Sequence, residues 1–169
     1  MSAPNAASAR EDRFHSLTPA SLSNAEQSSV VALALKVLSG RFRRGRTVNA
    51  PQDIQQFLRL KLSGRRNEVF GVIYLDARNR LIRIAELFHG TVDGAAVYPR
   101  VVVQKALDNN AAAVILVHNH PSNISEPSEA DRGITLKLAR ALALVDIRLV
   151  DHLVVTDSSF VSLADRGWI

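Results

Sequence analysis

A short apolar segment that ends in two histidines is the feature that most constrains this chain. Residues 111–118, AAAVILVH, form a continuous apolar run whose length suits a fully buried strand. His118 closes the run, and His120 and Pro121 follow it, although the chain has only 5 histidines. Ligands in α/β folds bind at the carboxyl ends of such strands. The segment therefore predicts an α/β protein with a polar site at one strand end.

The rest of the sequence alternates between helical and extended patterns. Helices are expected at 25–39, 51–62, 98–110 and 127–145, and strands at 68–76, 81–90, 111–118, 147–157 and 160–165. The first two strands are joined by Ala-Arg-Asn and read as an antiparallel hairpin, whereas helices separate the later ones. This order predicts an α/β sandwich with a mixed sheet.

Local signals place the helix ends. Asn24 is expected to cap the first helix and Gly40 to end it. Pro51 and Pro99 suit first helical turns, because the missing N–H of proline has no partner there in any case. The core-facing side of the last helix is predicted to consist of Ala130, Ile134, Leu138, Ala141, Leu142 and Val145.

Length and composition suggest one domain with an extension. The 169 residues divide into a predicted disordered tail at 1–24, a helix and basic linker at 25–48, and a folded domain at 49–169. The absence of cysteine excludes disulfides and thiolate metal sites. We see no secretory signal and no apolar run near the roughly 18 residues of a membrane span, so we expect a cytoplasmic protein without a membrane partner.

The net charge of +5 is concentrated near the N-terminus. Residues 1–50 hold seven basic and three acidic side chains, and the segment 41–46 reads RFRRGR. A solvated basic linker is the favoured interpretation. The alternative is a nucleic-acid contact through phosphates, although Phe42 alone is too little for a base-stacking platform. The side chains of such a patch are Arg41, Arg43, Arg44 and Arg46.

His118 and His120 are spaced to share one metal ion. Side chains at positions i and i+2 of an extended chain point the same way, with Cα atoms roughly 6.5–7 Å apart. Two imidazoles can then reach one ion at about 2.0–2.1 Å. Pro121 biases His120 towards extended geometry. The alternative is a simple turn in which Asn119 and Ser122 make local hydrogen bonds.

Asp131 supplies a third potential ligand. It falls one turn into the helix predicted at 127–145, and Ser128 lies three residues earlier on the same side. Two histidines, one carboxylate and an open position are the catalytic zinc pattern. A zinc ion held this way lowers the pKa of water to about 7. The residues alone therefore favour a zinc site formed by His118, His120 and Asp131.

A hydrolase of this kind also needs a general base. Four glutamates compete for that role: Glu68, Glu86, Glu126 and Glu129. We interpret Glu126 and Glu129 as favourable charges near a helix N-terminus. Spacing alone does not choose between Glu68 and Glu86.

The remaining histidines are assigned no metal. His152 follows Asp151 in a predicted strand, and we interpret it as structural, with support of a metal ligand as the less favoured alternative. His89 lies in a predicted turn and His15 in the predicted tail.

These motifs together resemble a known family. Glu68 followed by VFGVIYLD, HNHP at 118–121 and SEAD at 128–131 resemble the JAMM motif of the JAB (MPN-plus) metalloproteases. The segments YPRVVVQKALDNNAAAVILVHNHPS, EPSEAD and LVDHLVV resemble bacterial RadC-like proteins over roughly residues 50–169. The resemblance implies a three-layer α/β/α fold related to the cytidine deaminase arrangement. It also implies zinc-dependent hydrolysis of peptide or isopeptide bonds in a peptide or protein substrate.

The resemblance assigns roles to individual residues. His118, His120 and Asp131 become zinc ligands, Glu68 becomes the base, and Ser128 becomes the group that steadies the oxyanion. Asn123 stands where RadC-like proteins typically have glycine, and asparagine tolerates left-handed backbone angles. Longer relatives carry an N-terminal helix–hairpin–helix-like module, which residues 1–50 are too short to contain.

Three function classes follow. The first is a zinc metallopeptidase or isopeptidase. The alternative is a non-catalytic DNA- or protein-binding module associated with DNA repair, using the basic segment. A nucleobase deaminase is disfavoured, since those zinc sites use H-x-E with P-C-x-x-C and the chain has no cysteine.

Overall fold

A computed structural model describes residues 14, 16–41, 44–45, 47–48, 51–62, 64–90 and 96–169. The chain divides into two compact units, Met1–Ala34 and Leu35–Ile169. Most of the tail predicted at 1–24 lies outside the described residues, as do Arg43 and Arg46. That part of the domain division therefore stays a prediction.

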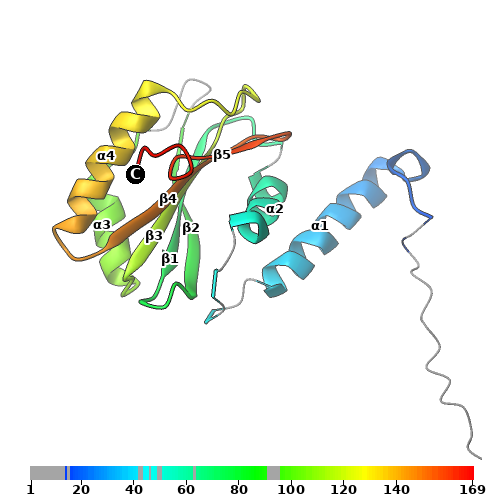
Figure 1. Ribbon diagram of the computed structural model, residues 1–169. Helices are drawn as coiled ribbons and strands as arrows, with labels where there is room; N and C mark the ends of the chain where they lie inside the picture. The colour runs from blue at the N-terminus through cyan, green and yellow to red at the C-terminus, as the bar shows by residue number, and fades with distance from the viewer. Residues whose placement is uncertain are drawn as a thin grey trace, which may run out of the picture. The chain divides into compact units, whose positions relative to one another are not determined.

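The second unit is built on a five-stranded mixed sheet. Its strands are β1 (Val69–Leu75), β2 (Leu81–His89), β3 (Ala113–Asn119), β4 (Arg148–Val155) and β5 (Phe160–Ser162). They follow the order β2-β1-β3-β4-β5 (Figure 1). Only β3 and β4 pair in parallel, and the other neighbours are antiparallel. The predicted hairpin and mixed sheet are confirmed.

Helices cover both faces of this sheet. On one face, α3 (Pro99–Asp108) and α4 (Glu129–Ala143) share a buried cluster with alternate residues of β1 and β3. On the other face, α2 (Pro51–Leu62) packs against the intervening residues of the same strands (Figure 1). The three-layer α/β/α fold implied by the family resemblance is therefore confirmed.

The central strand β3 is buried along its whole length because both of its faces are covered. Val114 and Leu116 face the α3/α4 layer, whereas Ile115 and Val117 face the α2 layer. Side chains of a strand alternate between faces. His118 therefore continues the row that faces α4, and Asn119 turns to the opposite side.

The helix α1 (Asn24–Arg41) differs from the prediction at both ends. Ser23 caps it in place of Asn24, since the Glu26 carboxylate accepts hydrogen bonds from the Ser23 backbone N–H (2.8 Å) and hydroxyl (2.7 Å). At the other end the helix continues through Gly40 to Arg41. A short 3₁₀ turn, η1 (Pro19–Ser21), precedes it.

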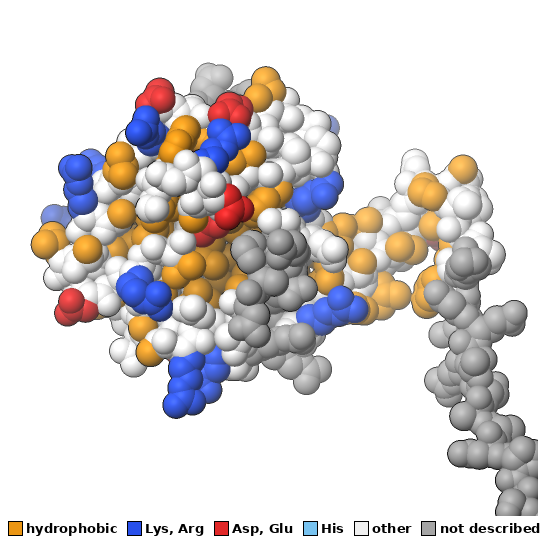
Figure 2. Space-filling model, in the orientation of Figure 1, with side chains coloured by type: hydrophobic (Ala, Val, Ile, Leu, Met, Phe, Trp, Pro, Cys, Tyr) orange, Lys and Arg blue, Asp and Glu red, His pale blue; other side chains and the backbone are white. Residues whose placement is uncertain are grey.

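Although α1 is rich in hydrophobic residues, none of them is fully buried. Figure 2 shows hydrophobic side chains exposed along this helix. Among the described residues, no helix has the length and apolar character needed to cross a membrane. The exposed side chains are Val30, Val31, Leu33 and Val37.

Two further details of the prediction are corrected. Ala130 is exposed in the first turn of α4, so the core-facing side of this helix begins at Ile134, and the neighbouring Thr135 is buried. The last predicted strand ends early at Ser162. There the Ser162 hydroxyl donates to Asp151 (2.7 Å) and accepts from the Asp165 N–H (3.0 Å), which turns the chain.

Two glycines are expected to respond in opposite ways to alanine. In β1, a Cβ at Gly71 would lie 3.0 Å from the Ala85 carbonyl oxygen and 3.2 Å from Val117 Cγ1. Gly71→Ala should therefore lower the free energy of unfolding by about 1–3 kcal/mol. Gly133 in α4 has open space around it, so Gly133→Ala should raise that free energy by about 0.5–1 kcal/mol. Urea unfolding of both variants tests this; equal shifts would contradict it.

Candidate metal centre

His118, His120 and Asp131 meet at the carboxyl end of β3. The Nε2 atoms of His118 and His120 lie 2.9 Å apart. The Asp131 carboxylate lies 3.1 Å from His118 Nε2 and 3.5 Å from His120 Nε2. One donor atom from each of the three residues falls within 4.8 Å of the others. A single ion with ligand distances of about 2.0–2.2 Å can bridge atoms so closely spaced. These are the three residues that the sequence brought forward as ligands.

The backbone around β3 explains the convergence of the two histidines. His118 ends the row of β3 side chains that faces α4. The His120 N–H donates to the Val155 carbonyl oxygen (3.0 Å), which prolongs the parallel pairing with β4 by one residue. His120 therefore points in the same direction as His118. Asn123 then turns the chain with a φ of 61°, so the expected left-handed conformation is confirmed.

Asp131 is held in place by the cap of α4. The Ser128 hydroxyl donates to the Asp131 carboxylate (2.6 Å), and so does the Ser128 backbone N–H (2.7 Å). In return, the Asp131 N–H donates to the Ser128 hydroxyl oxygen (3.1 Å). This reciprocal capping box fixes the carboxylate at the first turn of the helix. In this arrangement the hydroxyl proton of Ser128 is directed at Asp131.

The donor set fits a zinc ion. His120 Nδ1 lies 2.7 Å from the Ile124 carbonyl oxygen, which can only accept a hydrogen bond. The ring proton of neutral His120 therefore sits on Nδ1, and Nε2 keeps a lone pair that faces the other donors. Two imidazoles and one carboxylate are a set of three protein ligands of the kind found in catalytic zinc sites.

Electrostatics couple the three residues even without a metal. Burial raises the pKa of Asp131, but the hydrogen bonds that His118 and His120 donate when they carry a proton on Nε2 outweigh this and hold the pKa of Asp131 well below its usual range. The hydrogen bond that His120 donates to the Asp131 carboxylate raises the pKa of His120, although burial opposes it. The Ile124 carbonyl and the Glu68 carboxylate add smaller increases. A bound cation would take the place of the protons that this site attracts.

The two glutamates that spacing could not separate lie in different surroundings. Phe70 of β1 pairs with His118 of β3, which brings Glu68, two residues before Phe70, across from His120. Glu86 belongs to β2 and pairs with Gly71 of β1. Its carboxylate lies 3.3 Å from Lys61 Nζ and 3.5 Å from an Arg65 nitrogen. Lys61 belongs to α2, so Glu86 serves the opposite face of the sheet.

The side chain of Asn119, which lies between the two histidines, forms hydrogen bonds with the backbone at the start of β1. Its side-chain oxygen accepts a hydrogen bond from the Val69 N–H (2.7 Å), and its amide group donates to the Asn67 carbonyl oxygen (3.3 Å). Both partners are immediate neighbours of Glu68. The residue between the two histidines thus fixes the backbone that carries the candidate base. The sequence interpretation considered only local turn contacts for Asn119; strand alternation was the available signal.

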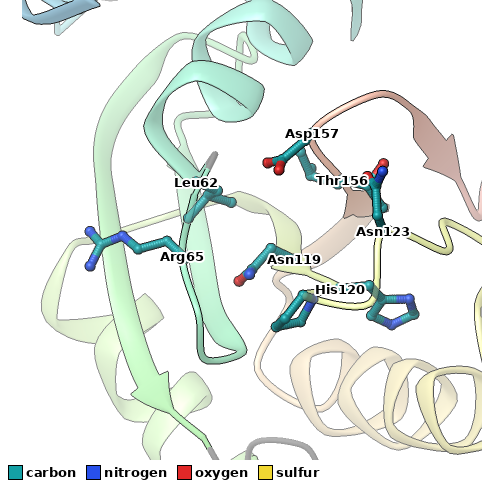
Figure 3. Close-up of a pocket in the computed structure, with 9 residues that line it drawn as sticks. Leu62, Arg65, Asn119, His120, Asn123, Thr156 and Asp157 are labelled. Atoms are coloured by element: carbon teal, nitrogen blue, oxygen red, sulfur yellow. The ribbon is translucent and has the colours of Figure 1, made fainter. Parts of the chain in front are cut away.

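A small pocket lies beside Asn119, at the turn after α2 and the ends of β3 and β4 (Figure 3). Its volume of about 20 Å³ has room for about one water molecule. The guanidinium of Arg65 points away from Asn119 and His120 in Figure 3. The pocket lining includes Leu62, Arg65, Asn119, His120, Pro121, Asn123, Val155, Thr156 and Asp157.

His152 lies directly behind His118, in the position that the less favoured sequence interpretation, support of a metal ligand, requires. Its Nε2 is 2.9 Å from His118 Nδ1, and its Nδ1 is 2.6 Å from the Thr135 hydroxyl oxygen. Asp151 does not bind this ring; it accepts a hydrogen bond from the His152 backbone N–H (2.7 Å). Burial lowers the pKa of His152 well below its usual value. Thr135 was missed altogether, although it follows Asp131 by one helical turn.

The other candidates are not part of the cluster of His118, His120 and Asp131. Both oxygens of the exposed Glu126 carboxylate pair with Arg166, one of them at 2.7 Å. Glu129 is exposed in the first turn of α4, as its interpretation as a helix-end charge requires. His89 is exposed at the end of β2.

The basic segment is only partly described. Arg41 ends α1 and Arg44 lies in a turn, and both are exposed. Arg43 and Arg46 fall outside the described residues. A nucleic-acid contact through this segment therefore stays a prediction.

Comparison with known proteins gives consistent matches. The family described as "RadC-like JAB domain" matches residues 48–168. A protein named "UPF0758 protein" from Vibrio cholerae is 52% identical over 145 residues, which cover 86% of this chain and 91% of the relative. Proteins of the same name from Cellvibrio japonicus and Stutzerimonas stutzeri are 51% and 46% identical, over 83% and 86% of this chain. The aligned part spans 63% and 65%, respectively, of those two longer relatives.

Proposed function

This chain belongs to the RadC-like JAB domain family, and from that premise we propose that it is a zinc-dependent hydrolase of peptide or isopeptide bonds. The convergence of His118, His120 and Asp131 at one strand end is the observation that carries the proposal. The position of Glu68 across from His120 supports it, because hydrolysis needs a base beside the metal ligands.

The chemistry divides between the ion and the chain. When bound, zinc supplies a Lewis acid that polarises the substrate carbonyl and makes water more acidic. Glu68 accepts a proton from the attacking water as the new carbon–oxygen bond forms. It then gives that proton to the leaving amine as the carbon–nitrogen bond breaks, so the base is regenerated. Asn119 keeps Glu68 in register with the histidines through its two backbone contacts.

Ser128 has two proposed roles that use the same hydroxyl group. Its proton is directed at the Asp131 carboxylate, which supports a role in holding that ligand. The role implied by the family resemblance, steadying the oxyanion, requires the hydroxyl to rotate about its Cβ–Oγ bond towards the substrate. Ser128 is exposed, so such a rotation meets no core packing.

The test is zinc content measured together with hydrolysis. Purified wild-type protein is expected to hold about one zinc per chain through three protein ligands, and His118→Ala is expected to hold far less, because two ligands remain. Elemental analysis of both proteins checks the metal. A library of peptide and isopeptide substrates, screened with the zinc-loaded wild type, checks the reaction.

The exposed histidine of β2 provides the matched control. His89→Ala removes an exposed imidazole that is not part of the ligand cluster and should keep the zinc content of the wild type. Equal zinc in wild type and His118→Ala would reject the site. Stoichiometric zinc without cleavage of any library member would leave the metal site in place and argue against the hydrolase.

A further inference from the structure

A closed ring of polar contacts runs behind the two ligands His118 and Asp131. His118 Nδ1 is 2.9 Å from His152 Nε2, and His152 Nδ1 is 2.6 Å from the Thr135 hydroxyl oxygen. The Thr135 hydroxyl lies 2.5 Å from the Asp131 carbonyl oxygen, and the Asp131 carboxylate returns to His118 Nε2 at 3.1 Å. The ring joins β3, β4 and α4. His118, His152 and Thr135 are each at most 1% exposed.

The direction of each hydrogen bond that leads from the Asp131 carbonyl oxygen to His118 Nδ1 can be derived from the Asp131 end. A carbonyl oxygen only accepts, so Thr135 must donate its single hydroxyl proton to Asp131. The Thr135 oxygen is then left to accept from His152, which places a proton on His152 Nδ1. A fully buried imidazole whose ring nitrogens face only a hydroxyl and another imidazole is neutral, because an unpaired buried charge is costly.

The same reasoning carries on to the metal ligand. Neutral His152 has one ring proton, on Nδ1, so its Nε2 can only accept. His118 must therefore donate from Nδ1. This leaves His118 Nε2 as the nitrogen that faces His120 and Asp131 with its lone pair. His120 adopts the same tautomer, with its proton on Nδ1, through a single hydrogen bond to the Ile124 carbonyl oxygen.

We propose that Thr135 and His152 are positioning residues that set the tautomer of His118 and so present its Nε2 atom to the metal. The proposal rests on the zinc site of the proposed function. It adds a link between two ligands, because the relay that orients His118 begins at the backbone of Asp131. A shift of α4 that moves Asp131 therefore also loosens the hydrogen bond behind His118.

A purely structural role for the same residues makes different predictions. Phe70 packs parallel to the His118 ring, with centroids 6.2 Å apart, and against the edge of His152 at 5.5 Å. If the relay only filled space, an isosteric side chain without a hydroxyl would serve equally well. A relay that sets a tautomer instead requires the hydroxyl oxygen of Thr135, whatever the packing.

The decisive experiment compares Thr135→Val with Thr135→Ser. Valine keeps the shape of threonine but lacks the hydroxyl, so the His152 proton is free to move to Nε2 and to force the opposite tautomer on His118. We expect zinc affinity, measured by competition with a chelator, to fall about 10- to 100-fold in Thr135→Val. Thr135→Ser keeps the hydroxyl and should bind zinc nearly as tightly as the wild type.

A spectroscopic measurement examines the relay without any metal. Imidazole ¹⁵N shifts distinguish Nδ1–H from Nε2–H tautomers. In metal-free wild type, at a pH where the histidines are neutral, His118 should carry its proton on Nδ1. In Thr135→Val a substantial fraction of His118 should carry it on Nε2. This measurement needs only folded protein. If Thr135 only filled space, the His118 tautomer would be the same in Thr135→Val as in the wild type.

Ser162→Ala is the control for general loss of stability. It removes another buried hydroxyl group, bonded to Asp151 on the same strand as His152, and should change neither zinc affinity nor the His118 tautomer. Wild-type zinc affinity in Thr135→Val, or a proton on His118 Nε2 in neutral wild type, would overturn the relay. If the wild type itself binds no zinc, the proposed function fails while the ¹⁵N measurement still decides the relay.

Discussion

Glu68→Gln is expected to bind zinc as the wild type does and to hydrolyse a susceptible substrate about 10²- to 10⁴-fold more slowly. Glutamine keeps the size and the polar character of the side chain, but it does not accept a proton from water at neutral pH. Glu68 is no metal ligand in our assignment, so the ion should remain. Zinc content and kcat/KM, measured on the same preparation with a substrate found by library screening, separate the two effects.

Glu86→Gln is the matched control for this substitution. Glu86 sits one strand away, but Lys61 and Arg65 hold its carboxylate on the α2 side of the sheet. Its replacement should leave both zinc content and turnover unchanged. A large loss of rate in Glu86→Gln together with an active Glu68→Gln would reverse the assignment of the base.

The convergence of His118, His120 and Asp131 could be predicted because it depends on local geometry. Alternation along a strand places residues i and i+2 on one side, and that rule alone orients His118 and His120. Asp131 needed only a second local rule, that a helix begins near Ser128. The left-handed turn at Asn123 was predictable for the same reason, since it reflects the preference of a single residue.

The surroundings of the ligands could not be predicted because they depend on strand register. Glu68 and Glu86 both lie near strand ends, and only the pairing of Phe70 with His118 brings the first of them to the site. The contact between His152 and His118 depends likewise on the parallel pairing of β3 and β4. That pairing has an irregularity between Val114 and Ile115, which no sequence spacing reveals.

The helix ends show a related limit. Ser23 and Asn24 are both residues that cap helices well. Ser23 is the cap in this structure because the Glu26 carboxylate accepts hydrogen bonds from its N–H and hydroxyl. Gly40 did not end α1, since glycine only weakens a helix and does not break it. Ala130 has the right spacing for the core but lies in the first turn of α4, before the buried positions begin.

Zinc is expected to stabilise the wild type strongly and Asp131→Ala hardly at all. A ligand that binds only the folded state adds about 2.7 kcal/mol at 100 times its Kd and about 4.1 kcal/mol at 1,000 times. Asp131→Ala removes the carboxylate that both imidazoles contact, so this gain should largely disappear. Thermal unfolding of both proteins with and without zinc measures the difference. Asp108→Ala, which removes an exposed carboxylate of α3 paired with Lys105, should keep the full zinc effect.

The pH dependence of the same experiment has a definite sign. Without metal, the raised pKa of His120 contributes stability that is present below its ordinary value of 6.5 and is lost as pH rises through the higher folded value. The lowered pKa of Asp131 contributes stability that is present above 3.8 and is lost as pH falls towards its low folded value. In metal-free protein the pair therefore stabilises most between these two ordinary values.

Zinc is expected to reverse the loss of stability that the metal-free protein shows as pH rises. Zinc binding requires neutral imidazoles, so its stabilising effect should grow between about pH 6 and pH 8, over the range in which the metal-free protein loses the contribution of His120. The two stability curves of the wild type should consequently diverge as pH rises, whereas those of Asp131→Ala should stay together. A wild-type zinc effect that is constant across this range would argue against histidine ligation, because ligands without a proton to release give no such slope.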